Sequence, residues 1–302
     1  MAASTEAEAA KRRFVDAQPS PTTSSIEELR ANDDRLFLSL VPADAVIEPA
    51  AGCPVPADWV HVPGADGDVT VLYFHGGGYF IGSKEGRHSL AAEISRYSGA
   101  RVLVAGYRRA PENRFPAAVE DALSAYTWLR GRVPASSIVL GGDSAGGGLA
   151  AIVASAVKDD PETRAAAAVL FSPFVDFTTP GASWKANSER DPISNGEMIP
   201  LLIEHYLGDG DPRDPRASPT YGDLHGLPPV LIFVGGDEGM VDDVADYATR
   251  VREAGGDADL QLYPDMFHVW PAFASILTEG RTALAHAGAF IRRHAGTPSQ
   301  GQ

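Results

Sequence analysis

The sequence predicts an α/β fold, with a mainly parallel central sheet flanked by helices and a helical cap. From Trp59 onward, short apolar runs alternate with helical patterns. The runs at 102–104 and 230–234 are continuously apolar, which is typical of strands covered on both faces. The interval 176–227 breaks the alternation, is rich in Pro, Asp and Ser, and is too long for a bare connection. We assign that interval to the cap.

Helical patterns come first along the chain. Residues 2–16 favour helix, and Ser24 with Glu27 has the spacing of a capping box for a second helix. We expect residues 1–50 to form N-terminal helices that join the insertion 176–227 in the cap. The main domain then covers 51–175 and 228–296, and residues 297–302 are expected to be a disordered tail.

The elements of the main domain follow in order. We expect strands at 69–74, 101–105, 138–140, 167–171, 230–234 and 260–263. We expect helices at 88–98, 117–129, 149–157, 241–253 and 272–294, with one more at 197–207 inside the cap. In the last helix of the chain, apolar residues recur on one face, which would pack on the sheet.

The charge and the cysteine content of the chain limit its possible partners and metal sites. The chain of 302 residues carries 40 acidic and 25 basic side chains, and the net charge of -15 makes nucleic acid an unfavourable partner. Cys53 is the only cysteine, so neither an intrachain disulfide nor a thiolate metal cluster can form. We expect no metal or cofactor. Without a signal segment or an apolar run of membrane-spanning length, we expect a cytoplasmic protein with no stable membrane association, either a monomer or a homodimer.

A Gly-x-Ser-x-Gly sequence places Ser144 between an apolar run and a small-residue helix. A serine held on a sharp strand-to-helix bend is exposed as a nucleophile, and the nearby helix N-terminus favours negative charge. Taken alone, the motif is as compatible with a simple glycine-rich turn. It lacks the lysine of a phosphate-binding loop, which disfavours nucleotide binding.

A second glycine-rich sequence, starting at His75, directly follows the strand expected at 69–74. Consecutive glycines let backbone N–H groups converge on one point, as the stabilisation of an oxyanion requires. The N–H of Ala145 would supply a further donor. His75 itself is expected to shape the loop.

A nucleophilic serine needs a base and an acid that orients it. His268 is the best candidate for the base because it follows the expected strand 260–263. For the acid we predict Asp237, just beyond the strand 230–234, with Asp191 and Asp176 as weaker rivals. Asp242 and Asp243 fit a helix N-cap better.

These motifs together resemble the hormone-sensitive-lipase-like esterases and lipases of the α/β-hydrolase fold. The resemblance covers about 69–294 and rests on six stretches: His75-Gly76-Gly77-Gly78, Tyr107-Arg108-Arg109-Ala110-Pro111-Glu112, Phe115-Pro116-Ala117-Ala118, Gly142-Asp143-Ser144-Ala145-Gly146-Gly147, Gly236-Asp237-Glu238 and Phe267-His268. Arg109 departs from the leucine usual in the family, which we expect to alter packing or loop electrostatics.

The resemblance implies Ser144 as nucleophile, Asp237 as acid and His268 as base. It also implies an oxyanion hole formed by the N–H groups of Gly77, Gly78 and Ala145, with Gly76 supporting the loop. Asp143 is then expected to brace the turn.

We therefore expect a serine carboxylesterase that acts on short-to-medium acyl esters of small molecules. The same residues would also suit a lactone hydrolase or a deacetylase of a specialised metabolite. A non-catalytic ligand-binding protein is the alternative outside the enzymes, and it would require a broken triad. Plausible pocket-lining residues, which could equally be packing aromatics, are Tyr79, Phe80, Trp184 and Tyr206.

Overall fold

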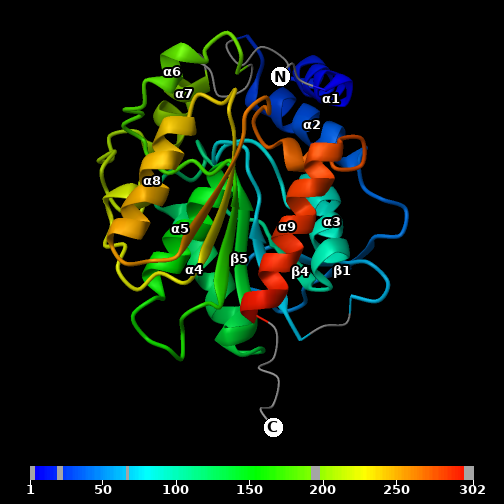
Figure 1. The fold of residues 1–302 in the computed structure, drawn as a ribbon, viewed down its shortest axis with the longest axis vertical. Coiled ribbons are helices and arrows are strands. Elements are labelled where there is room, and N and C mark those ends of the chain that lie inside the picture. Colours follow the sequence, from blue (N-terminus) through cyan, green and yellow to red (C-terminus); the bar gives the residue numbers. More distant parts are fainter. Residues whose placement is uncertain (1–3, 19–22, 66–67, 192–197, 296–302) are drawn as a thin grey trace.

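An eight-stranded sheet runs through the middle of the molecule (Figure 1). The computed structural model describes residues 4–18, 23–65, 68–191 and 198–295. The strand order is β1-β2-β4-β3-β5-β6-β7-β8, in which β4, β3 and β5 to β8 are parallel, whereas β2 is antiparallel to both β1 and β4. The strands are β1 Val46–Pro49, β2 Ala57–His61, β3 Thr70–Phe74, β4 Arg101–Ala105, β5 Ile138–Asp143, β6 Ala167–Phe171, β7 Val230–Gly235 and β8 Ala258–Tyr263.

All six expected strands are present, and the expected α/β fold is confirmed. The strands β1 and β2, which precede the six, were not expected. The four residues of β1 are all exposed and end in Pro49, so its two apolar residues are too few to mark it as a strand. Because β1 lies within 46–49, the sheet begins inside the segment that we assigned to the cap.

Helices cover both faces of the sheet. On one face α3 and α9 pack against each other, and on the other α5 packs on β5 and β6 with α4 beside it, while α8 lies beside β7 and β8 (Figure 1). The helices are α1 Thr5–Ala17, α2 Ile26–Leu38, α3 His88–Ser98, α4 Ala117–Arg130, α5 Ala145–Ala156, α6 Ser183–Ala186, α7 Met198–Leu202, α8 Val241–Glu253 and α9 Thr278–Ala295. Shorter helical turns lie at Glu85–Arg87, Ala135–Ser137, Ile203–Leu207, Pro219–Tyr221 and Trp270–Phe273.

Three of the helix starts that differ from the expectation have a clear local reason. The N-cap of α2 is Ser25, whose hydroxyl accepts from the Glu28 N–H while the Glu28 carboxylate accepts from the Ser25 N–H, so the capping box lies one residue later than predicted. The helix α5 begins at Ala145 rather than at 149, since the glycines of its first turn have low helix propensity and hide the start. The helix α9 begins at Thr278 because a separate 3₁₀ turn precedes it.

The core lies on both faces of the sheet. Along β3, Leu72 and Phe74 pack into the apolar cluster under α4 and α5, whereas Val71 and Tyr73 pack into the cluster under α3 and α9. This alternation on a fully buried strand accounts for the continuously apolar runs in the sequence.

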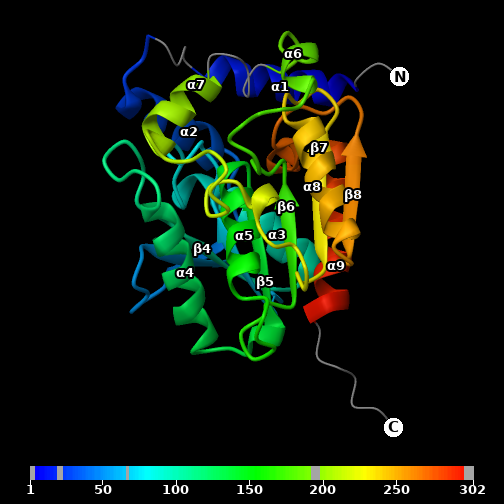
Figure 2. The ribbon, with the colours of Figure 1, turned by 90° about the vertical axis from the view of Figure 1, so that its left-hand side faces the viewer.

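The helices α1, α2, α6 and α7 lie at one end of the molecule in both views (Figures 1 and 2). Three contacts fix which end this is. Lys11 of α1 pairs with Asp237 after β7, Arg30 of α2 donates to the Phe80 carbonyl after β3, and Leu202 of α7 lies over Gly78. The segments assigned to the cap therefore contact the loops at the carboxyl ends of the parallel strands. The expected tail at 297–302 is outside the described residues.

Candidate active site

Ser144 lies on the turn that joins β5 to α5. Its backbone has φ 52° and ψ −121°, a conformation that few residues other than glycine adopt. A Cβ on Gly142 would lie 2.2 Å from the Gly146 carbonyl oxygen, and one on Gly146 would lie 2.0 Å from the Phe74 carbonyl oxygen. Gly142 therefore lets the chain bend sharply at the serine, and Gly146 lets the turn pack against the end of β3.

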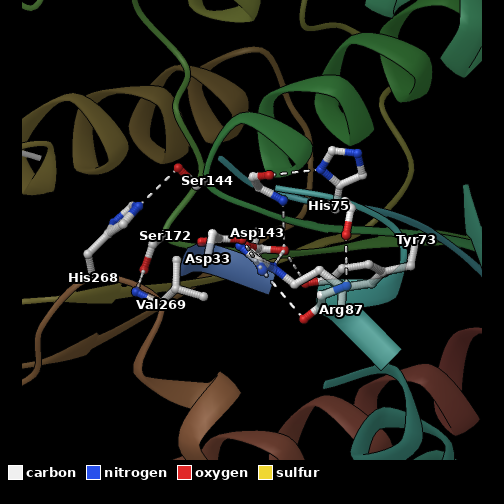
Figure 3. Close-up of polar contacts among 12 residues, drawn as sticks. Asp33, Tyr73, His75, Arg87, Asp143, Ser144, Ser172, His268 and Val269 are labelled. Atoms are coloured by element: carbon white, nitrogen blue, oxygen red, sulfur yellow. Dashed lines mark hydrogen bonds and ion pairs between the residues drawn. The ribbon is translucent and has the colours of Figure 1, made fainter. Parts of the chain in front are cut away.

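Three side chains form one hydrogen-bonded chain at the carboxyl end of the sheet. Ser144 Oγ is 2.9 Å from His268 Nε2 (Figure 3), and His268 Nδ1 is 2.7 Å from Glu238 Oε2. Because an ionised carboxylate only accepts, Nδ1 carries the hydrogen and the lone pair of Nε2 faces the serine hydroxyl. The structure thus brings Ser144 and His268 together as predicted.

The prediction of Asp237 as the partner of the histidine is wrong. Its N–H donates to the Met266 carbonyl, and its side chain points toward α1, where Oδ2 lies 2.9 Å from Lys11 Nζ. The next residue, Glu238, folds back over the end of its own strand, and its Oε1 accepts from the Gly235 N–H at 2.6 Å. Because the loop turns in this way, the carboxylate that contacts the histidine belongs to Glu238, one residue after the predicted Asp237.

The two rival carboxylates also lie elsewhere. Asp191 accepts from the Gly239 N–H at 2.7 Å, and Asp176 accepts from the N–H and hydroxyl of Thr178. Asp191 therefore holds the loop that carries Glu238, and neither residue accepts a hydrogen bond from His268 in the contacts of the described chain.

Burial and charge set the basicity of His268. Its side chain and that of Glu238 are almost inaccessible to solvent. Burial alone would lower the pKa of His268, but the hydrogen bond and the charge of Glu238 outweigh that effect and raise it above its usual value. Asp191 and Asp143 act in the same direction. The imidazole is therefore a stronger base than a histidine in water.

The glycine loop after β3 has the backbone freedom expected of it. Gly77 has φ +110° and Gly78 has φ +57°, both in the region that favours glycine. A Cβ on Gly76 would lie 2.3 Å from Asp143 Oδ2, so the loop packs directly on the serine turn. Ala145 is the first residue of α5, where N–H groups lack partners within the helix. The N–H groups of Gly77, Gly78 and Ala145 remain the predicted oxyanion donors.

His75 shapes this loop from the side. Its ring stacks on Tyr107 at 4.1 Å, and its Nδ1 lies 2.8 Å from the Gly76 carbonyl oxygen. Burial lowers the pKa of His75 to about 4, so the ring is neutral at pH 7 and its Nδ1–H donates to that carbonyl. A buried, neutral and fully packed imidazole agrees with a loop-shaping residue.

Beneath the site lies a buried ionic cluster, formed by Asp143, Arg87, Asp33 and Tyr73 (Figure 3). Asp143 Oδ1 accepts from the Gly76 N–H and from the Tyr73 hydroxyl, and Arg87 Nε lies 2.9 Å from Asp143 Oδ2. Arg87 also reaches Asp33 of α2 at 3.3 Å. Asp143 thus braces the serine turn and the glycine loop together, as expected, while Arg87 links both to the N-terminal helices.

The aromatic residues suggested for the pocket are mostly packed together. Tyr79 and Tyr206 stack at 3.9 Å, both are buried, and Phe80 lies beside His205. Trp184 donates its indole N–H to Asp243. The structure shows packing contacts for these side chains, and their role in binding substrate stays a prediction.

Neither a metal centre nor a membrane-spanning helix occurs among the residues that the structure describes. They contain no group of three or more His, Cys, Asp or Glu side chains placed to hold a metal ion. None of the helices in the described ranges combines the length and apolar character needed to cross a membrane.

Sequence reasoning missed three functional candidates in the site. Glu238 stood inside a recognised motif, and only the direction of the loop selects it over its neighbour. Ser172 and Arg87 carry no local signal, since their partners lie 66 and 56 residues away along the chain.

Comparisons with known proteins agree with this geometry. A family model described as the α/β hydrolase fold matches residues 71–272. An acetyl-hydrolase of Streptomyces hygroscopicus is 42% identical over 241 residues, covering 80% of each chain. A putative acetyl-hydrolase of Mycobacterium tuberculosis, LipR, is 34% identical over 249 residues, covering 82% of this chain and 80% of its own.

Solved structures are similar over nearly the whole chain. The crystal structure of an esterase from the bacterial hormone-sensitive lipase family matches with a TM-score of 0.93 and 41% identity, covering 98% of this chain and 100% of that one. A structure soaked with p-nitrophenyl butyrate matches with a TM-score of 0.91 and 36% identity, over 98% and 100% of the two chains. The chain therefore belongs to the α/β-hydrolase family, in its hormone-sensitive-lipase-like branch, and is a serine carboxylesterase.

Proposed function

We propose that this esterase cleaves short-to-medium acyl esters of small molecules through an acyl-enzyme on Ser144. His268 is the base, and Glu238 is the acid that orients it. The hydrogen-bonded chain from Ser144 Oγ through the two ring nitrogens of His268 to Glu238 is the observation that carries this proposal.

Acylation begins with the neutral imidazole. Since Nδ1–H donates to Glu238, the free Nε2 accepts the Ser144 hydroxyl proton as Oγ attacks the acyl carbonyl. The negative charge that develops on the carbonyl oxygen would be stabilised by the N–H groups of Gly77, Gly78 and Ala145. Collapse of the tetrahedral intermediate breaks the bond to the alcohol, which takes the proton from Nε2.

Deacylation repeats these steps with water as the nucleophile. His268 accepts a proton from water, the hydroxide attacks the acyl carbon, and Ser144 leaves with the proton returned from Nε2. Glu238 remains ionised and stabilises the imidazolium formed in each half-reaction. The products are a carboxylic acid and an alcohol.

We also propose that the part of residues 1–50 that precedes the edge strand β1 acts, together with residues 176–227, as a cap over this site. Their contacts with the loops that carry Glu238 and the glycine sequence support this role. The acyl preference would then depend on the cap.

The names of two similar proteins, both acetyl-hydrolases, favour a short acyl group. We expect kcat/KM for p-nitrophenyl esters to be highest between C2 and C6 in a series from C2 to C12. A maximum at C10 or C12 would contradict the preference for short-to-medium acyl groups.

The mechanism is tested by Ser144→Ala. We expect kcat on p-nitrophenyl acetate to fall by about 10⁴-fold or more, because no other group can form the acyl-enzyme. A fluorophosphonate probe should label the wild type at Ser144, identified by peptide mass, and leave the variant unlabelled. A wild type that binds esters but neither hydrolyses them nor reacts with the probe would be a ligand-binding protein instead.

A further inference from the structure

A short turn after β6 forms two hydrogen bonds with the backbone of the nucleophile Ser144. The Ser144 N–H donates to the Phe171 carbonyl at 2.9 Å, and the Phe174 N–H donates to the Ser144 carbonyl at 2.9 Å. The residue at the centre of this turn is Ser172, whose exposed fraction is 0%. A side chain so enclosed cannot touch a substrate, so any role of Ser172 acts through its neighbours.

The hydroxyl of Ser172 contacts the acid of the catalytic chain and the backbone of the residue that follows its base. Its Oγ is 2.7 Å from Glu238 Oε1. It is also 3.1 Å from the backbone nitrogen of Val269, the residue after His268 (Figure 3). The directions of these bonds are fixed, because the Val269 N–H can only donate and an ionised carboxylate can only accept. Ser172 therefore donates its single proton to Glu238.

The backbone of Ser172 is also strained. Its φ is +46°, in the left-handed region that favours glycine, although the residue is a serine. Its N–H donates to the Phe233 carbonyl at 2.7 Å, which holds the turn against β7. Residues kept in such conformations concentrate at functional sites, where the surrounding structure determines them.

We propose that Ser172 is a positioning residue of this esterase, which holds the acid and the histidine loop in register with the nucleophile. This inference rests on the proposed function. With Oε1 occupied by the Ser172 hydroxyl and the Gly235 N–H, the carboxylate presents Oε2 to His268 Nδ1. One turn thereby contacts Glu238 through the Ser172 hydroxyl, the histidine loop through the Val269 N–H, and Ser144 through the backbone.

The same hydrogen bond disperses the charge of Glu238. When the hydroxyl is removed, more negative charge remains on Oε2, which favours the imidazolium and raises the pKa of His268 further. The carboxylate also loses one of its anchors, and the buried Val269 N–H loses its acceptor. The lost anchor of the carboxylate and the lost acceptor of the Val269 N–H should both slow proton transfer without weakening substrate binding.

Ser172→Ala tests this role, and Ser95→Ala is its matched control. Ser95 is also 0% exposed, accepts from the Val62 N–H and donates to the Ala100 carbonyl, but it lies on α3 and has no contact with the catalytic chain. For Ser172→Ala we expect kcat to fall about tenfold, as for a lost hydrogen bond to a charged group, with KM unchanged. The acid limb of kcat/KM should move to higher pH. Ser95→Ala should lose stability with its kcat and pH profile unchanged.

Ser172→Gly covers the case in which the alanine variant does not fold, since glycine accepts the positive φ while removing the hydroxyl. It should show the same loss of kcat and the same shift of the acid limb. A kcat within twofold of wild type and an unmoved acid limb, in whichever of the two variants folds, would overturn the positioning role. Ser144→Ala in parallel separates the two proposals, because its full activity would refute the mechanism itself.

Discussion

The loops at the carboxyl edge of the sheet and the cap elements above them are held by different kinds of contact. At the sheet edge the polar groups are buried, and Glu238 alone accepts three hydrogen bonds, from His268, Ser172 and the Gly235 N–H. Where α1 meets the same loop, Lys11 pairs with Asp237 through side chains that are 23% and 16% exposed. The reacting groups are thus fixed by the core, whereas α1 rests on the loop through a partly solvated ion pair.

Two neighbouring residues show the difference between the buried and the partly solvated contacts. Glu238 faces the core and His268, whereas Asp237 faces α1 and the cap. A carboxylate at the end of a strand is therefore not sufficient to identify the acid. What decides is which side of the loop faces the buried base.

The largest effect should come from replacing these two carboxylates in turn. For Glu238→Gln we expect kcat/KM to fall by about 10³–10⁴-fold, because a neutral amide cannot stabilise the imidazolium and permits the wrong tautomer. For Asp237→Asn we expect a fall of less than about fivefold, as for a partly exposed ion pair. Rates on p-nitrophenyl acetate measure both variants. Equal losses in the two variants would contradict the assignment of the acid.

The pH profile sharpens the same comparison. Because the base must be neutral and Glu238 raises the pKa of His268, kcat/KM of the wild type should increase through an apparent pKa above about 6.5. In Glu238→Gln the residual activity should titrate at lower pH than in the wild type. The histidine also contributes stability below its unfolded pKa, which is lost as the pH rises through the folded value.

The next largest effect should come from Arg87, whose buried ion pairs connect α2 of the cap with Asp143 at the sheet edge. Arg87→Met leaves Asp143 and Asp33 buried without their cation, so we expect the free energy of unfolding to fall by about 3–5 kcal/mol. Urea denaturation followed by fluorescence measures this loss. Arg96→Met is the matched control, because Arg96 and Asp44 form an exposed pair whose loss should cost about 0–1 kcal/mol. Similar losses in both variants would show that the buried cluster does not anchor α2.

Much of this architecture could be predicted from the sequence because it is decided locally. The apolar runs of the parallel strands reflect burial on both faces. Gly142 is required by a backbone contact within its own turn, whereas Gly146 is required by the Phe74 carbonyl at the end of β3. Both glycines flank Ser144 in the sequence, so the position of the serine followed from its immediate neighbours. His268 followed for the same reason, since it lies just after a strand that the sequence indicates.

The remaining features depend on contacts between distant segments. The choice of Glu238 over Asp237 depends on how the loop after β7 meets His268 and α1, which lie 30 and 226 residues away. Arg87 joins elements that are far apart in sequence, and β1 has only two apolar residues, both exposed. Local propensity carries no information about such partners, so only the assembled fold reveals them.

The smallest effect should come from the ion pair between α1 and the catalytic loop. For Lys11→Met we expect a stability loss of about 0–1 kcal/mol, because the pair with Asp237 is partly exposed to solvent. The loss should shrink at about 1 M salt, where charges are screened within about 3 Å. A double variant with Asp237→Asn should lose little beyond the larger single loss, since the two residues share one interaction. Arg13→Met, on the same helix but bonded to Ser39, is the control. A loss for Lys11→Met as large as that for Arg87→Met would mean that α1, like the sheet edge, is held by buried charge.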